Sequence, residues 1–247
     1  MFIVLVLGSG NSSAQVELQK LDQYLEKSAQ AWGVPAMSVA IVKDGRIVFE
    51  KGYGVLEVGK PNKTNEHTLY AIASNTKAFT AAAMARLVQA GKLSWQDKVI
   101  DHLPYFRMYD EYVTQHTNIE DILSHRVGLG TFSGDVVWDA STFTSEEIIR
   151  RIQYLPQAYP FRGGFGYSNM MYITAGEVIH KVSDKPWGEY VREQFLTPLG
   201  MSRTITSLKA LKEKSNYATP HAFRDNGKNE PIVWTDWEQV IPKPNMI

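Results

Sequence analysis

One helix-length stretch, Thr76–Ala90, is apolar on nearly every side and constrains the fold more than any other segment. Its many alanines, together with Phe79, Met84 and Leu87, leave no continuous polar face. A helix of this kind is stable only where other elements cover it. Gly91 follows directly and can end the helix. The sequence therefore predicts a globular core built around a buried helix.

An amphipathic helix and a hairpin are predicted before this stretch. Apolar residues recur at three- and four-residue steps over Val16–Trp32, and Gly33 can supply a left-handed cap. Two apolar, β-branched runs follow, Met37–Val42 and Arg46–Tyr53. Asp44-Gly45 joins them and is typical of a tight type I′ turn. We expect these strands to enter a central sheet.

The middle of the chain is predicted to be mostly helical. The pairs Thr117/Glu120 and Thr144/Glu147 have the spacing of a capping box, which predicts helices starting near Asn118 and Ser145. The predicted fold class is α+β, with an antiparallel sheet flanked by helices and a mostly helical subdomain. Further helices are expected over 170–182 and 186–196, and a turn at Asp225-Asn226-Gly227.

Charge and cysteine content exclude several classes of function. The chain has 26 Lys plus Arg against 26 Asp plus Glu, so it has no basic excess for binding nucleic acid. It has no cysteine, which excludes a disulfide framework, a thiolate metal site and a cysteine nucleophile. Its 247 residues can bury a sizeable core, as one large domain or two interleaved ones.

The N-terminal run Met1–Gly8 is apolar but far shorter than the roughly 20 residues of a membrane-spanning helix. Ser12 and Ala14 are small residues at the positions that a signal peptidase recognises, so residues 1–14 are predicted to be a signal peptide. The usual basic segment is missing, so either the true start lies upstream or this run is a buried N-terminal strand. We expect an exported protein, periplasmic or secreted, whose domain spans residues 15–247.

Ser74 and Lys77, at the start of the predicted buried helix, have the spacing of a nucleophile and its base. A serine hydroxyl needs a neighbour to take its proton, and a residue three positions on lies one helical turn away. No other serine in the chain has a lysine at this spacing. Free N–H groups at a helix start can also stabilise an oxyanion. The alternative is an N-cap serine beside a solvated lysine.

A second motif, Tyr167-Ser168-Asn169, follows the glycine-rich segment Arg162–Gly166 and is the only Tyr-x-Asn in the chain. Glycines there would let the backbone approach a ligand closely. A phenol near a cationic lysine could shuttle a proton, and the Asn169 amide could hold a substrate carbonyl or orient Lys77. Alternatively, Tyr167 is a core residue and Ser168-Asn169 an ordinary turn pair.

Together these residues resemble the penicillin-binding, serine beta-lactamase-like superfamily, whose signature begins with Ser-x-x-Lys on a buried helix. The tyrosine in the second motif is similar to the branch of class C beta-lactamases, D-alanyl-D-alanine carboxypeptidases and esterases. The resemblance covers roughly residues 21–207. It also rests on Gly33-Val34-Pro35, Ile72–Thr80, Gly91-Lys92-Leu93, Leu123–Leu129 and Pro198–Met201.

The resemblance implies a role for each motif residue. It makes Ser74 the nucleophile, Lys77 and Tyr167 the general base and acid, and Asn169 a substrate-binding side chain. It implies a small-molecule or peptide substrate and no metal or organic cofactor. His125 lies in a matching stretch, but we expect it to shape a turn rather than to titrate. None of the six histidines has metal-ligand spacing.

The family's third motif, Lys or His followed by Thr or Ser and then Gly, is expected on a C-terminal strand that supplies a second oxyanion donor. None of the glycines after Asn169 has this context; they are Gly176, Gly188, Gly200 and Gly227. We expect that the chain lacks the C-terminal part of the domain, that it offers one clear hairpin, and that its sheet is incomplete. A divergent terminus is the alternative.

The leading functional hypothesis is a serine hydrolase that acts through an acyl-enzyme on an amide or ester. A beta-lactam, a D-amino peptide and a small ester are all open as substrates, because pocket walls decide among them. The alternatives are a non-catalytic penicillin-binding or sensor-like protein and an inactive fragment. The sequence leaves the oligomeric state open.

Overall fold

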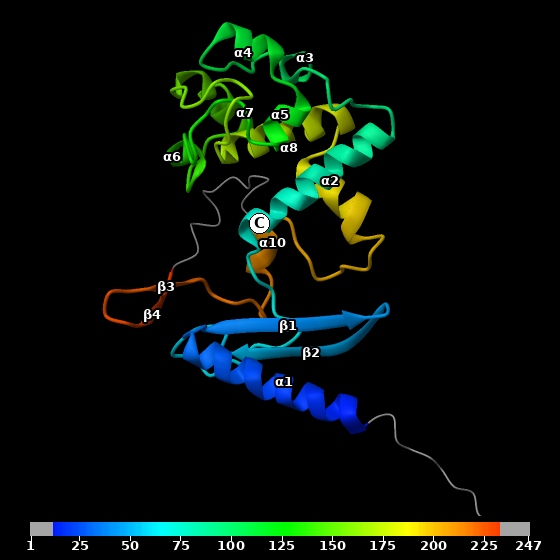
Figure 1. Cartoon of the computed structure of the whole chain (residues 1–247), viewed down its shortest axis with the longest axis vertical. Coiled ribbons are helices and arrows are strands. Elements are labelled where there is room, and N and C mark those ends of the chain that lie inside the picture. Colours follow the sequence, from blue (N-terminus) through cyan, green and yellow to red (C-terminus); the bar gives the residue numbers. More distant parts are fainter. Residues whose placement is uncertain (1–11, 233–247) are drawn as a thin grey trace, which may run out of the picture. The chain divides into compact units, whose positions relative to one another are not determined.

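The computed structural model describes residues 12–232, which form two compact units (Figure 1). The first unit combines residues 12–70 with 215–232, and the second holds residues 71–214. The predicted leader lies outside the described residues except for its last three, which begin helix α1. Within residues 12–232, no helix is long and apolar enough to cross a membrane.

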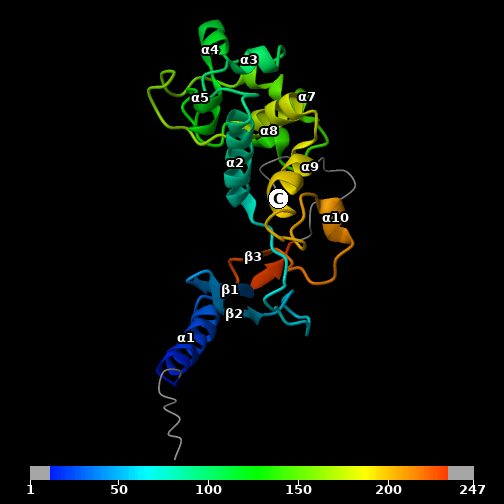
Figure 2. The same ribbon diagram turned by 90° about the vertical axis from the view of Figure 1, so that its right-hand side faces the viewer.

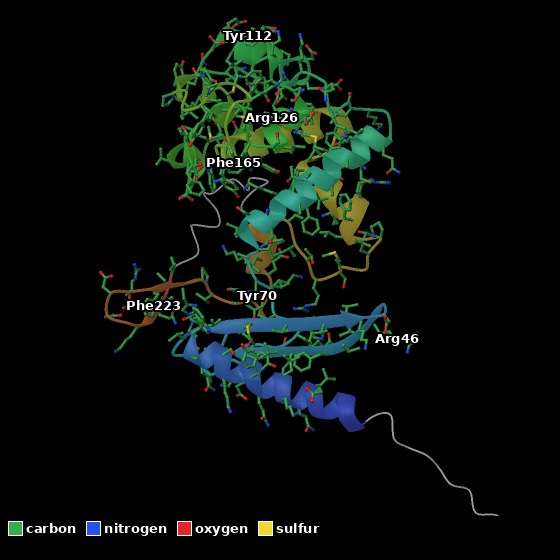
Figure 3. All side chains as sticks on the ribbon, in the orientation of Figure 1. Arg46, Tyr70, Tyr112, Arg126, Phe165 and Phe223 are labelled. Atoms are coloured by element: carbon green, nitrogen blue, oxygen red, sulfur yellow. The ribbon has the colours of Figure 1, made fainter. Side chains whose placement is uncertain are left out.

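Helix α1 (Ser12–Ala31) and the hairpin β1 (Ala36–Lys43) and β2 (Arg46–Gly54) form the first unit's main part. Figure 1 shows α1 lying along this hairpin. The two turn residues have φ angles of 53° and 72°, as a type I′ turn requires. Arg46 lies at this turn (Figure 3). The predicted helix and hairpin are confirmed.

Asp22 fastens α1 to the hairpin. Its carboxylate accepts hydrogen bonds from Lys51 Nζ at 2.7 Å and from the Tyr53 hydroxyl at 2.7 Å. The ammonium and the phenol hold the pKa of Asp22 below its usual range. This polar contact holds α1 in position against β2.

A second antiparallel hairpin, β3 (His221–Phe223) and β4 (Asn229–Pro231), also belongs to this unit. The sequence predicted its turn but not its strands, since three residues are too few to show an alternating pattern. The expectation of a single clear hairpin is therefore wrong. Over residues 12–232 the two hairpins are separate two-stranded sheets, so the predicted central sheet is absent from this part of the chain.

The second unit packs helix α2 (Thr76–Gln89) against α8 (Asn169–Ser183), side by side in Figure 2. Helix α8 is the more deeply buried of the two, with ten buried residues out of 15. Helix α2 is buried on one broad face, while Ala78 and Ala85 are exposed. The prediction of a helix buried on all sides is thus only partly right, because alanines tolerate exposure at little cost.

Short helices surround this pair. The predicted capping box at Thr144 and Glu147 is confirmed at α7 (Ser145–Ile149). The box of α5 (Ile119–Leu123) lies one residue later than predicted, at Asn118 and Asp121. The other helices are α3 (Val99–His102), α4 (Glu111–His116), α6 (Asp135–Trp138), α9 (Trp187–Val191) and α10 (Leu208–Lys212), with a π-helical turn over Arg192–Leu196. The α+β class is confirmed.

Candidate active site

Ser74 sits in a 3-10 turn, Ala73–Asn75, that leads directly into α2. The Asn75 side chain and its backbone N–H both donate to the Ile72 carbonyl, at 2.9 and 3.0 Å, and so close the turn. Ala73 has a φ of 45°, a left-handed conformation that is uncommon for a residue with a Cβ. Ser74 is exposed, whereas Lys77 is 7% exposed. The hydroxyl is therefore accessible beside a buried ammonium.

The four residues that the sequence singled out converge in the second unit. The Tyr167 hydroxyl donates to Ser74 Oγ at 2.6 Å, and Lys77 Nζ donates to the same oxygen at 3.2 Å. Lys77 Nζ also donates to Asn169 Oδ1 at 2.7 Å. Two motifs separated by 93 residues thus form one hydrogen-bonded cluster around Ser74.

Close backbone contact between two loops places Tyr167 at Ser74. The Gly166 N–H donates to the His125 carbonyl at 3.0 Å, and the Phe132 N–H donates to the Tyr167 carbonyl at 2.8 Å. A Cβ at Gly166 would overlap the Leu129 carbonyl oxygen, so only glycine fits there. The sequence predicted that these glycines admit a ligand. The structure instead sets Gly166 against the chain's own backbone.

His125 packs against the Tyr167-Ser168-Asn169 motif. It has a φ of 58°, which confirms the predicted turn, and its Nδ1 accepts the Ser168 N–H at 3.1 Å. Its ring lies 4.6 Å from that of Tyr167 and 5.2 Å from that of Tyr172. Burial, followed by the positive charge of Lys77, lowers the pKa of His125 to about 4. The imidazole is therefore neutral at neutral pH, with its proton on Nε2.

Two tyrosines flank the Lys77 ammonium but differ in chemistry. Their ring centroids lie 4.9 Å (Tyr167) and 5.2 Å (Tyr172) from Nζ. Burial works to raise the pKa of the Tyr167 phenol, but its interactions with Lys77 and Ser74 outweigh burial, and the pKa falls below its ordinary value. Burial raises the pKa of Tyr172, whose hydroxyl donates to the Leu123 carbonyl at 3.0 Å. Only Tyr167 is both close to Ser74 and easier to ionise.

Asp135, at the start of α6, completes the cluster and was missed by the sequence analysis. Its Oδ2 accepts from Asn169 Nδ2 at 2.9 Å, and its Oδ1 accepts from the Trp138 indole at 2.8 Å. Asn169 itself is 7% exposed, with its amide oxygen facing Lys77. A single acid outside both motifs carries no spacing signal for a partner 34 residues away.

A second missed acid, Asp121, joins the loops that carry His125 and Tyr167. Its side chain is fully buried and accepts from Arg126 Nε at 2.6 Å and from Arg162 at 2.9 and 2.7 Å. Burial works to raise the pKa of Asp121, but the hydrogen bonds from Arg162, the Asn118 backbone and Arg126 hold it below its usual range. Figure 3 shows Arg126 in this helical unit. The ion pairs therefore brace the loop contact that positions the phenol.

Apolar surface borders the cluster. Phe132 is 59% exposed, and its ring meets that of Tyr167 edge-on at 5.4 Å. Phe165, labelled in Figure 3, meets His125 edge-on at 5.5 Å. An apolar pocket also adjoins the turn of Ser74, and its lining includes Ile72, Thr76, Phe79, Trp187, Val191 and Leu196. Among residues 12–232, no group of three metal-binding side chains occurs.

Two curated proteins are related to this chain in sequence. Unguisins hydrolase ungD' of Aspergillus campestris (strain IBT 28561) is 36% identical over 200 residues, which cover 77% of this chain and 37% of that protein. Protein flp of Staphylococcus aureus (strain N315) is 33% identical over 201 residues, which cover 81% of this chain and 40% of flp. The chain thus spans 37% and 40% of the length of these two curated relatives.

A solved structure has the same fold. The octameric penicillin-binding protein homologue from Pyrococcus abyssi matches with a TM-score of 0.75 and 27% identity, over 87% of this chain and 50% of that one. The sequence model of the beta-lactamase family matches residues 21–245. The chain therefore belongs to the beta-lactamase family, in the superfamily that includes the penicillin-binding proteins.

Proposed function

We propose that this protein is a serine hydrolase that forms an acyl-enzyme at Ser74 on an amide or ester substrate. One observation carries the proposal: Ser74 Oγ lies 2.6 Å from the Tyr167 hydroxyl and 3.2 Å from Lys77 Nζ. An exposed serine between two proton-carrying groups is what nucleophilic catalysis needs. The relative named a hydrolase supports the same reaction class.

In the first half-reaction, Ser74 Oγ bonds to the substrate carbonyl carbon and its proton passes to the Lys77–Tyr167 pair. The pair then protonates the leaving alcohol or amine as the carbonyl is restored. In the second half-reaction, water attacks the acyl ester and gives its proton to the same pair. The proton returns to Ser74 Oγ when the acid product leaves, so the enzyme is regenerated.

The proposed proton carriers are suited to these steps by their surroundings. The lowered pKa of Tyr167 makes its phenolate a more accessible base than that of an ordinary tyrosine. Lys77 supplies the positive charge that stabilises such a phenolate. We assign the donor to the developing oxyanion to the Ser74 N–H, which belongs to the 3-10 turn that leads into α2.

The apolar surroundings favour a substrate with an apolar group near its carbonyl. Phe132 exposes most of its ring beside the Tyr167 phenol, and Ile72 and Thr76 on either side of Ser74 line an apolar pocket. Covering apolar surface of this kind with a substrate group makes the free energy of binding more favourable. A beta-lactam, a D-amino peptide or a small ester with an apolar substituent meets this condition.

The test is covalent labelling with a fluorophosphonate, read by intact mass. We expect one adduct on the wild-type chain and none on Ser74→Ala. Ser94→Ala is the matched control, since Ser94 is also exposed and lies in the same unit. Equal labelling of Ser74→Ala and wild type would show that the nucleophile assignment is wrong.

A penicillin-binding protein that acylates without turnover is the second candidate. Its support is the 27% identity to the penicillin-binding protein homologue. A penicillin adduct at Ser74 that persists for hours favours the binding protein. A burst followed by steady release of the hydrolysed product favours the hydrolase.

A further inference from the structure

We propose that Asp135 is a positioning residue for the reaction: its carboxylate fixes the Asn169 side chain so that the amide oxygen, and not the amide nitrogen, faces Lys77. This inference rests on the proposed acylation of Ser74. It concerns a residue outside both sequence motifs, the first residue of α6.

One end of the Asn169 side-chain amide faces a hydrogen-bond donor, and the other end faces an acceptor. Oδ1 accepts from Lys77 Nζ at 2.7 Å, and Nδ2 donates to Asp135 Oδ2 at 2.9 Å. An ionised carboxylate only accepts hydrogen bonds and an ammonium only donates them. The amide can satisfy both neighbours in one orientation alone. Because Asn169 is 7% exposed, solvent cannot readily replace a lost partner.

Asp135 is held in place by its own surroundings. Its second oxygen accepts the Trp138 indole N–H at 2.8 Å, and its backbone N–H donates to the Phe132 carbonyl at 3.1 Å. Gly134, just before it, has a φ of 85°, and a Cβ there would lie 2.8 Å from a Leu155 methyl carbon. The backbone that presents the carboxylate is therefore tightly defined.

The orientation of the amide decides where the Lys77 ammonium sits. Lys77 Nζ contacts Asn169 Oδ1 at 2.7 Å and Ser74 Oγ at 3.2 Å, so one amide oxygen and one hydroxyl share the cation. If the amide turned over, its NH₂ group would face the ammonium, and two donors would repel. Lys77 would then leave the position from which it reaches Ser74.

Asp135 also acts on Tyr167 through its charge. The groups around the phenol are Lys77, which favours the phenolate, Asp135, which disfavours it, and the neutral His125. Replacing Asp135 therefore has two opposite effects on the pKa of Tyr167: it removes the weaker, opposing charge of Asp135, and by releasing Lys77 it removes the stronger influence that lowers this pKa. The loss of the Lys77 contact dominates, so the acid side of a pH–rate profile should move to higher pH while the maximal rate falls.

The experiment compares Asp135→Asn with Asp139→Asn, which removes an equal charge from an exposed site four residues away. The rate of Ser74 labelling by a fluorophosphonate is measured from pH 5 to 9, with thermal unfolding as the folding control. We expect Asp135→Asn to label about tenfold more slowly or worse at the plateau, with the acid side of its pH profile shifted to higher pH. Asp139→Asn should match wild type, and Asp135→Glu, which keeps the carboxylate, should recover part of the rate.

A second readout does not depend on acylation. The Asn169 side-chain NH₂ gives a pair of ¹⁵N-correlated proton signals, assigned by their absence from Asn169→Ala. We expect one of these protons to exchange slowly in wild type and in Asp139→Asn, and to exchange fast in Asp135→Ala, which leaves no side-chain acceptor at this position.

The labelling rate and the amide exchange together distinguish the positioning role of Asp135 from the proposed hydrolase activity. If the wild-type chain shows the protected amide proton, and Asp135→Ala loses it, while no variant is labelled at Ser74, then Asp135 orients the amide and the proposed hydrolase activity is wrong. If wild type is labelled and Asp135→Asn keeps both its rate and pH profile, the positioning role is overturned. Protection that survives in Asp135→Ala overturns it as well.

Discussion

The hydroxyl groups of Tyr167 and Ser74 are joined by a 2.6 Å hydrogen bond, although the residues are 93 positions apart. The bond exists because the loop around His125 and the loop ending at Gly166 share backbone hydrogen bonds at both ends of the tyrosine. Helix α2 then brings Lys77 to the same oxygen. Local loop geometry, rather than the helix alone, determines whether Ser74 has a phenol beside it.

Removing the Tyr167 hydroxyl tests its role in proton transfer. Tyr167→Phe should slow acylation of Ser74 by about 100-fold or more, the usual scale for loss of a general acid or base. Tyr172→Phe is the matched control, since its ring lies at a similar distance from Lys77 while its hydroxyl bonds to the Leu123 carbonyl. Rates would be compared with a chromogenic ester or a fluorophosphonate. Equal slowing by both substitutions would contradict a specific role for Tyr167.

The ionisation of Tyr167 can be followed by tyrosinate absorbance. The difference between wild type and Tyr167→Phe should show one phenol that titrates below the ordinary tyrosine value of about 10. Burial disfavours the phenolate, but the hydrogen bonds with Lys77 and Ser74 and the charge of Lys77 together outweigh burial. In a Lys77→Met background the midpoint should move upward. A midpoint unaffected by Lys77→Met would refute this electrostatic account.

Gly166 should tolerate no side chain. Gly166→Ala places a Cβ on the Leu129 carbonyl oxygen, so the two loops must separate and Tyr167 must move from Ser74. We expect slower labelling of Ser74 together with a lower melting temperature. Gly130→Ala is the control, because its Cβ would make only a 3.4 Å contact with the Ala158 methyl. If Gly166→Ala labels as fast as Gly130→Ala, the loop contact does not position the phenol.

The parts that the sequence predicted correctly are those encoded locally. Asp44-Gly45 supplies both left-handed residues of the hairpin turn, and the Thr144/Glu147 box starts α7 as expected. The second capping box moved by one residue because the Thr117 hydroxyl donates to the Val113 carbonyl and ends α4 instead. Asn118 was then left to start α5.

The candidate site also contains both residues whose contacts follow from local spacing and residues whose contacts do not. Ser74 and Lys77 are one turn apart, so their spacing alone predicts contact. Asp135 and Asp121 make their functional contacts with residues 34 and 41 positions away. Nothing in the local pattern at either acid specifies such a partner, since each pairing depends on how separate loops pack. Single-sequence patterns therefore predict the reacting groups better than the residues that hold them.

The buried carboxylate of Asp121 should be important for stability. Asp121→Asn keeps the shape but leaves Arg126 and Arg162 without their shared anion, and we expect a loss of about 2–3 kcal/mol in unfolding free energy. The loss is smaller than for a fully buried pair because the two arginine side chains are 32% and 43% exposed. Glu120→Gln removes a more exposed partner of Arg126 and should cost about 0.5 kcal/mol or less. Urea unfolding of both variants decides this, and similar losses would contradict it.

His125 should make stability depend on pH in the mildly acidic range. Its pKa is about 4 in the folded protein and 6.5 in the reference state, so the unfolded chain binds the extra proton first as pH falls. The contribution of neutral His125 to the free energy of unfolding is fully present above pH 6.5. It is lost between pH 6.5 and 4, with about 2 kcal/mol lost by pH 5. His125→Asn keeps an acceptor for the Ser168 N–H and tolerates the φ of 58°, but cannot titrate. Urea unfolding at pH 7 and pH 5 should therefore show a smaller drop for His125→Asn than for wild type, and an equal drop in both would mean that His125 is not the group responsible.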